Sequence, residues 1–209
     1  MKTTMASVPD RIMQRARAGG RGGVFTPRDF LDVAGRAAVD QALSRLVKSG
    51  KLRRLARGLY DFPKVHPKLG PLSPAPDDVA RALARETGSL AQISGAHAAN
   101  ALGLSTQVPA QSLYLTNGPS RRIVLGKRVV DLRHASPKHL IAPGSPAGTV
   151  VQALRHVGAG RAADVAKVAA RRLSANDKKV LASSVIQAPA WMRPTLMSIG
   201  SAASSSADG

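Results

Sequence analysis

The side chains best suited to contact nucleic-acid bases and phosphates gather between residues 36 and 57. Arginine and glutamine carry paired hydrogen-bonding groups that match the edges of guanine and adenine, and arginine and lysine neutralise phosphates. Serine can also contact base edges. The side chains of these four types are Arg36, Gln41, Ser44, Arg45, Lys48, Lys51, Arg53, Arg54 and Arg57. Together they favour a surface that binds duplex DNA.

Apolar periodicity predicts three helices that would position these side chains. A first amphipathic helix covers residues 8–18 and stops at a pair of glycines. Residues 26–29, Thr-Pro-Arg-Asp, are typical of a capped helix start, and the short second helix ends near Gly35. The third helix begins at Arg36 and ends near Ser49. Two helices therefore follow one another closely, as in a helix-turn-helix.

The third helix has one apolar stripe and one polar face. The stripe consists of Val39, Leu43, Leu46 and Val47. With this stripe turned towards a core, the outward residues are Arg36, Ala37, Asp40, Gln41, Ser44, Arg45 and Lys48. We expect the early residues of this face to read bases in the major groove.

A basic β-hairpin is predicted over residues 51–63. Two short apolar-polar runs flank a turn at Arg57-Gly58. Arg53, Arg54 and Arg57, with Lys51 before them, are expected to hold phosphates and so position the third helix. Three helices followed by a basic hairpin is the order of a winged helix-turn-helix.

The overall charge agrees with a polyanionic partner. Lys and Arg number 31 against 12 Asp and Glu, which gives a formal net charge of +19. Residues 1–70 hold 15 basic and 5 acidic side chains, so the first third of the chain carries more than half of the excess. Apolar residues make up 44% of the chain, which predicts a folded protein, and the 3% of aromatic residues is too few for stacked single strands.

Pro and Gly divide the chain into parts. We predict a winged helix-turn-helix domain over residues 1–66, a Pro-rich linker over 67–76, an α+β domain over 77–200 and a disordered tail over 201–209. The predicted fold class is α+β, with an N-terminal winged helix-turn-helix followed by a mixed α/β C-terminal domain.

The second domain is expected to mix helices and strands. Helices are predicted at 77–86, 94–104, 149–157, 161–172 and 177–186, and strands at 112–118, 121–125 and 128–134. The strands carry a second basic set: Arg121, Arg122, Lys127, Arg128 and Arg133. This set is a solvated strand surface, a second DNA contact or a patch that faces a toxin or a phosphate.

Several stretches resemble the AbiEi-type antitoxins, the DNA-binding members of type IV toxin–antitoxin systems. The resemblance covers about residues 8–190 and is carried by residues 38–46, 57–60, 94–96, 99–109, 114–118 and 136–138. It implies a repressor that binds inverted repeats in its own operator and neutralises a cognate nucleotidyltransferase toxin, with direct binding of the toxin left open. A free-standing winged-helix regulator and an enzyme that inactivates the toxin by phosphoryl transfer are the alternatives.

Other chemistry finds little support in the sequence. There is no cysteine, and the five histidines, His66, His97, His134, His139 and His156, lack the spacing of metal ligands. Asp131 is the only acid between Glu86 and Asp164, which argues against the paired carboxylates of a nuclease. A phosphate contact from His134 and His139 around residues 136–138 is a weaker hypothesis than a plain turn.

No phosphate-binding loop or kinase signature occurs in the sequence, so a non-enzymatic protein without cofactor or metal is expected. No window is apolar enough for a membrane span, and the first residues lack the apolar core of a signal peptide. We therefore expect a cytoplasmic location.

Overall fold

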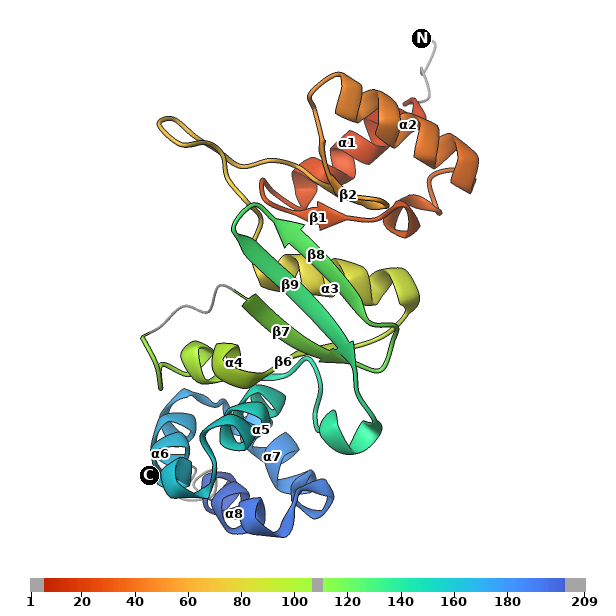
Figure 1. Cartoon of the computed structure of the whole chain (residues 1–209). Helices are drawn as coiled ribbons and strands as arrows, with labels where there is room; N and C mark the ends of the chain where they lie inside the picture. Colours follow the sequence, from red (N-terminus) through yellow and green to blue (C-terminus); the bar gives the residue numbers. More distant parts are fainter. Residues whose placement is uncertain (1–5, 107–110, 202–209) are drawn as a thin grey trace. The chain divides into compact units, whose positions relative to one another are not determined.

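The computed structural model describes residues 6–106 and 111–201 and has a mixed α+β architecture (Figure 1). The chain divides into two compact units. The first contains Met1–Ser89 with Ile123–Lys127, and the second contains Leu90–Arg122 with Arg128–Gly209. Within the described ranges, no helix is long and apolar enough to cross a membrane.

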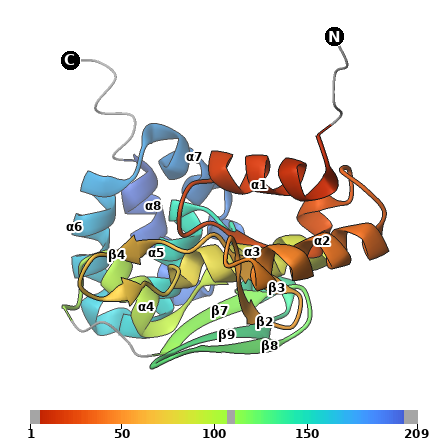
Figure 2. The same cartoon turned by 90° about the horizontal axis from the view of Figure 1, so that it is seen from above.

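In the first unit, α1 (Val8–Ala18) packs against α2 (Arg36–Lys48) (Figure 1, Figure 2). The hydroxyl of Ser7 accepts a hydrogen bond from the backbone N–H of Asp10 and so caps the start of α1. Both helices match their predicted positions. Their apolar faces enclose Ile12, Phe30 and Leu43, which are fully buried.

The predicted second helix is a single 3₁₀ segment, η1 (Pro27–Phe30). The carboxylate of Asp29 accepts hydrogen bonds from the backbone N–H of Thr26 at 2.7 Å and from the Thr26 hydroxyl at 3.2 Å. The capped start expected from the sequence is therefore confirmed. A short turn then leads from η1 into α2.

Three short strands complete this part of the first unit. They are β1 (Val24–Phe25), β2 (Arg53–Ala56) and β3 (Leu59–Asp61), and they form an antiparallel sheet in the order β1-β3-β2. The turn between β2 and β3 lies at Arg57-Gly58, as predicted, and Gly58 adopts a φ of +71° that favours glycine.

The segment predicted as a Pro-rich linker over 67–76 contains structure. Strands β4 (Val65–His66) and β5 (Gly70–Pro71) pair in an antiparallel hairpin. The Nδ1 atom of His66 accepts hydrogen bonds from the backbone N–H groups of Lys68 and Leu69 and thereby closes the turn. The many prolines of this segment therefore did not indicate that it contains part of a hairpin.

Helix α3 (Pro76–Thr87) belongs to the first compact unit, so the division falls after Ser89 rather than at 67–76. Arg85 binds the Asp29 carboxylate at 3.1 Å and the carbonyl of Val24 at 3.1 Å. Arg28 donates a hydrogen bond to the carbonyl of Glu86 at 2.9 Å. These long-range contacts hold α3 against the segment that contains η1 and β1.

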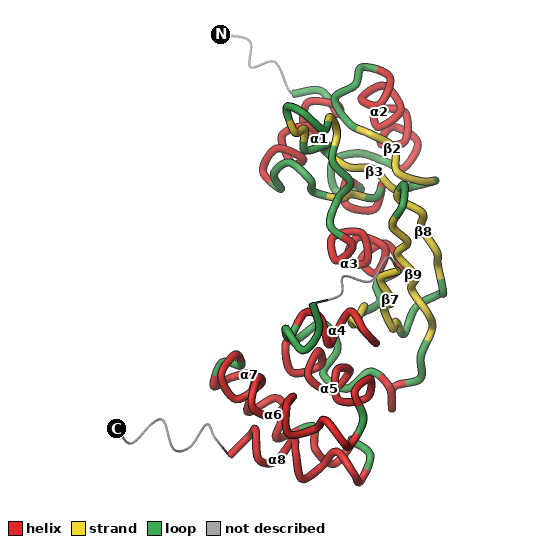
Figure 3. Tube along the Cα trace, turned by 60° about the vertical axis from the view of Figure 1, so that its left-hand side comes forward, coloured by secondary structure: helices red, strands yellow, loops and turns green. Residues whose placement is uncertain are grey.

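A four-stranded sheet follows, with the order β6-β7-β9-β8. Its strands are β6 (Ala91–Ile93), β7 (Gln111–Thr116), β8 (Arg121–Leu125) and β9 (Arg128–His134), the last three of which lie at the predicted positions. The sheet is mixed, because β7 runs antiparallel to β6 and parallel to β9. Figure 3 shows β7, β9 and β8 side by side.

The second unit also contains a helical core. It is built from α4 (Gly95–Ala101), α5 (Pro146–Val157), α6 (Ala162–Arg172), α7 (Ala175–Ser183) and α8 (Arg193–Ser201). The hydroxyl of Ser174 caps α7 by accepting from the backbone N–H of Asp177 at 3.1 Å. Helix α8 was not predicted, and it includes Ser201; the rest of the predicted tail, 202–209, lies outside the described residues.

A buried polar network joins α5 to the preceding loop. The Gln152 amide donates to the carbonyl of His139 at 2.7 Å and accepts from the Ser94 hydroxyl at 3.2 Å. Ser94 directly precedes α4, but its hydroxyl donates to Gln152 and does not cap that helix. Gly148 lies so close to the loop that a Cβ there would meet the carbonyl of Ala142, which explains the small residue.

Candidate nucleic-acid interface

The exposed face of α2 is the one expected from the sequence. Its buried side consists of Val39, Ala42, Leu43 and Leu46. Its exposed polar side chains are Arg36, Asp40, Gln41, Ser44, Arg45 and Lys48. The predicted division of this helix into an inner stripe and an outer face is therefore confirmed.

Arginines of α1 fix the turn that leads into α2. The Arg15 guanidinium binds both carboxylate oxygens of Asp32, at 2.7 and 2.6 Å, and the carbonyl of Asp29 at 2.6 Å. Arg11 donates to the carbonyl of Val33 at 3.1 Å. These contacts set the direction in which α2 leaves the turn, so part of the basic face of α1 has a structural role.

The contact between Arg15 and Asp32 also shifts the pKa values of both side chains. The hydrogen bond from Arg15 lowers the pKa of Asp32 to about 2, because it favours the ionised carboxylate. The hydrogen bond that Arg15 donates to Asp32 raises the pKa of Arg15 in turn. Both side chains therefore remain charged at neutral pH.

The sequence predicted that Arg53 contacts phosphates, but its side chain also makes contacts within the protein. Its guanidinium donates to both oxygens of Asp61, at 3.0 and 2.5 Å, and to the carbonyl of Leu72 at 2.7 Å. Asp61 is fully buried, and the two residues face each other across β2 and β3. Arg53 therefore has a structural role, because it neutralises a buried carboxylate and holds the chain beyond β3, while its contact with phosphate stays a prediction.

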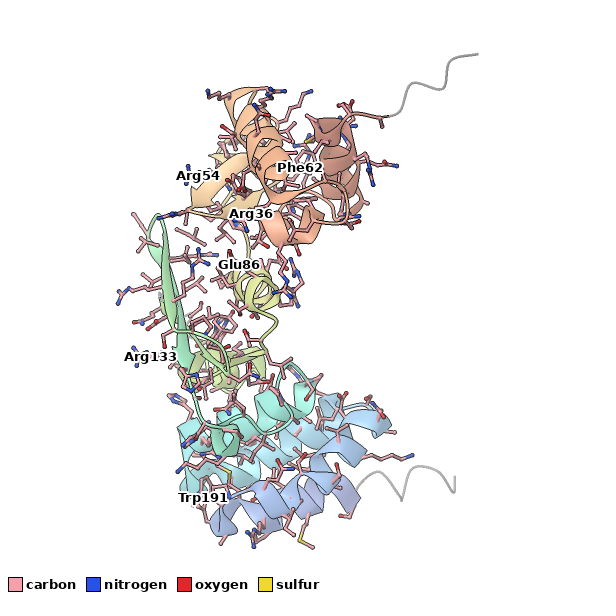
Figure 4. All side chains as sticks on the ribbon, turned by 90° about the vertical axis from the view of Figure 1, so that its right-hand side faces the viewer. Arg36, Arg54, Phe62, Glu86, Arg133 and Trp191 are labelled. Carbon is pink, nitrogen blue, oxygen red and sulfur yellow. The ribbon has the colours of Figure 1, made fainter. Side chains whose placement is uncertain are left out.

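The other basic residues of the hairpin region are exposed. Arg54, Arg57 and Lys51 all have exposed side chains, and Arg54 makes one long hydrogen bond, at 3.4 Å, to the carbonyl of Ala56 (Figure 4). Because successive side chains of a strand point to opposite faces, Arg53 and Arg54 lie on opposite faces of β2. Lys51 and Arg54, together with Lys48 at the end of α2, are exposed where phosphates can reach them.

Asp40 lies on the exposed face of α2 but was not assigned a role from the sequence. The Arg36 Nε atom donates to Asp40 at 2.9 Å, and the two residues are four positions apart on α2. Their spacing, one helical turn, is visible in the sequence and is the signal that identifies the pair. Asp40 therefore belongs to the candidate interface with Arg36.

The second basic set lies on β8, β9 and the turn between them. Arg122, Lys127 and Arg128 are exposed, whereas Arg121 is half-buried. Arg133 has an exposed side chain but binds Asp131 at 3.0 Å (Figure 4). These residues therefore differ in how available they are to an anionic partner.

Asp131 and His139 have contacts within the protein. Asp131 is buried and also accepts from the Gln111 amide at 3.0 Å. Burial, with the nearby charges of Arg155 and Lys138, lowers the pKa of His139. The Arg155 guanidinium lies 3.2 Å from His139 Nδ1, where a neutral imidazole acts as acceptor. Across the described ranges, no three His, Asp or Glu side chains are grouped to hold a metal.

Comparison with known proteins places the chain in a family. It belongs to a family of unknown function (DUF6088), whose model matches residues 11–181. The match extends over both compact units and includes the whole of α2 and the β2–β3 hairpin. Neither the curated proteins nor the solved structures contain a significant match.

Proposed function

We propose that the first unit binds duplex DNA as a winged helix, with α2 as the recognition helix and the β2–β3 hairpin as the wing. The observation that carries this proposal is the exposed face of α2, where Arg, Gln, Ser and Lys side chains project beside a basic hairpin. The element order α1-β1-η1-α2-β2-β3 and the sheet order β1-β3-β2 support it.

Each exposed side chain has a proposed role in the complex. Gln41, Ser44 and Arg45 contact base edges from the middle of α2, where arginine and glutamine match guanine and adenine. Lys48, Lys51, Arg54 and Arg57 bind phosphates along the groove and set the position of the helix. The chain's net charge of +19 favours association with DNA over distances comparable to the Debye length.

The resemblance to AbiEi-type antitoxins supports a fuller proposal. In it, the DNA is the inverted-repeat operator of the chain's own operon, and the second unit counteracts a nucleotidyltransferase toxin in the cytoplasm. The exposed residues Arg122 and Arg128 of the second unit are the candidate toxin-facing or phosphate-facing residues. A toxin-rescue growth assay beside an operator reporter tests this role. Replacing Arg122 and Arg128 with Ala is expected to lower rescue while the reporter stays repressed, whereas Arg45→Ala is expected to derepress the reporter while rescue persists.

The DNA-binding proposal is tested by the salt dependence of binding to a labelled duplex. Replacing Lys48, Lys51 and Arg54 with Ala is expected to weaken binding and to flatten the plot of log affinity against log salt by about one unit per lost contact. The control removes the same charge from the second unit, at the exposed residues Lys167, Arg171 and Lys179. Equal losses for both triple variants, or no binding by the unmodified protein, would overturn the proposal.

A further inference from the structure

An acidic side chain lies on the otherwise basic face of α2. Asp40 is the only acid between Asp32 and Asp61, and its side chain is 48% exposed. A carboxylate that faces DNA repels phosphates, so its presence lowers affinity for duplexes in general. Its role on this face must therefore come from a specific contact.

That contact is with Arg36, at the start of α2 (Figure 4). The Nε atom of Arg36 donates to Asp40 Oδ2 at 2.9 Å. In the described part of the chain, no other hydrogen bond to the Arg36 side chain is found. The two terminal nitrogens of the guanidinium thus remain open, and their spacing matches the O6 and N7 acceptors of guanine.

The pair is poorly arranged for helix stability. Arg36 is the first residue of α2, where the positive end of the helix dipole disfavours a cation. An acid that precedes a base by four residues is the favourable order in a helix, and here the order is reversed. An exposed pair of this kind contributes little to folding, so the arrangement fits a role in orienting Arg36 better than a role in stability.

We propose that Asp40 is a positioning residue that holds the Arg36 fork for a guanine, so that the preferred DNA site contains guanine at the position facing Arg36. This inference rests on the proposed DNA binding. The benefit comes from pre-organisation, because a long side chain already held in one rotamer loses less entropy when it binds. The negative charge of Asp40 also reduces binding to DNA that lacks this guanine.

The experiment first selects preferred duplexes from a randomised pool with the full-length protein. Affinity is then measured for the selected duplex and for duplexes changed at one base pair. Arg36→Ala and Arg36→Lys identify the base position that Arg36 reads. At that position, both variants are expected to reduce the preference for guanine by about 5- to 150-fold. Lysine keeps the charge but lacks the fork, so both variants should lose this preference.

Asp40→Ala is expected to reduce the guanine preference at that same position by about 2- to 12-fold. It should leave preferences elsewhere unchanged and slightly raise affinity for random DNA. In the Arg36→Ala background the Asp40 change should have no further effect on preference. The control is Asp164→Ala, which removes an equally exposed acid paired with Arg161 in the second unit.

The outcomes separate this inference from the proposed function. If the protein binds no duplex, the proposed function fails. If it binds duplexes with a base preference that Asp40→Ala leaves intact, the positioning role of Asp40 is refuted while DNA binding stands. If it binds all sequences equally, the guanine contact is refuted in the same way.

Discussion

Mutation of the neighbouring residues Arg53 and Arg54 is expected to affect different properties. Arg53→Ala should lower the stability of the fold, and Arg54→Ala should lower the affinity for DNA. Arg53→Ala leaves the buried carboxylate of Asp61 without its charge partner. Removing one partner of a buried ion pair costs about 3–5 kcal/mol. Because the Arg53 side chain is 31% exposed, water compensates in part, and we expect a loss of about 2–4 kcal/mol in the free energy of unfolding.

A loss of this size lowers the melting temperature by about 4–16 °C for a chain of this length. Arg54→Ala removes an exposed side chain and should change stability by less than about 0.5 kcal/mol. Its effect should instead be weaker binding to every duplex and a flatter salt dependence. Thermal unfolding followed by circular dichroism, together with DNA titrations, measures both properties on the same variants.

A double variant tests the cause of the Arg53 effect. Arg53→Met combined with Asp61→Leu removes both charges and should recover much of the stability lost in Arg53→Ala, because no unpaired charge remains buried. The reasoning is refuted if Arg53→Ala melts like the unmodified protein and loses only DNA affinity. It is also refuted if Arg54→Ala is the variant that unfolds.

Three further changes have expected outcomes. Replacing Gln41 or Arg45 with Ala should cost about 1–3 kcal/mol on a preferred duplex and relax base preference, and equal losses on random DNA would contradict base reading. Gly148→Ala should lower unfolding free energy by about 1–3 kcal/mol in urea titrations, because its Cβ would meet the Ala142 carbonyl, and an unchanged midpoint would contradict this contact. Because the folded state lowers the pKa of His139, the unfolded state takes up its proton first as pH falls below about 6.5, so stability should fall there. His139→Gln should flatten this pH dependence of the melting temperature, and an unaltered profile would exclude His139 as its source.

Local sequence signals predicted the elements that carry the candidate interface. The apolar stripe of α2 and the Arg57-Gly58 turn each depend on residues close together in the chain, and both are confirmed. The outer face of α2 followed directly from helical periodicity. The exposure of Gln41 and Arg45 was therefore predictable, whereas their contact with bases stays a prediction.

Features that depend on distant contacts were not predictable from the sequence. Arg53 and Arg54 are adjacent and chemically identical, and only the pairing of β2 with β3 shows that Arg53 faces a buried carboxylate. Helix α3 was assigned to the second domain because a Pro-rich segment precedes it. The contact between Arg85 and Asp29, which are 56 residues apart, holds it in the first unit and could not be seen in the sequence. Such contacts form only when the chain has folded, and no local pattern encodes them.

The boundary region shows the same limit. Proline and glycine disfavour long helices and central strands, but they are compatible with a short exposed hairpin such as β4–β5. The hairpin depends on the His66 side chain and on a bond from the backbone N–H of Leu72 to the carbonyl of Lys64 at 2.8 Å. A fragment intended to fold alone should therefore include α3 rather than end before it.

The central claim, that the exposed face of α2 and the β2–β3 hairpin bind duplex DNA, is tested most directly by a nuclear magnetic resonance titration. The full-length ¹⁵N-labelled protein is titrated with a selected duplex, and shifts of the backbone amide signals are mapped on the chain. We predict that the largest shifts fall in residues 36–58. Shifts confined to residues 121–133 or to the helices from α5 to α8 would contradict the claim, as would a spectrum that DNA leaves unchanged.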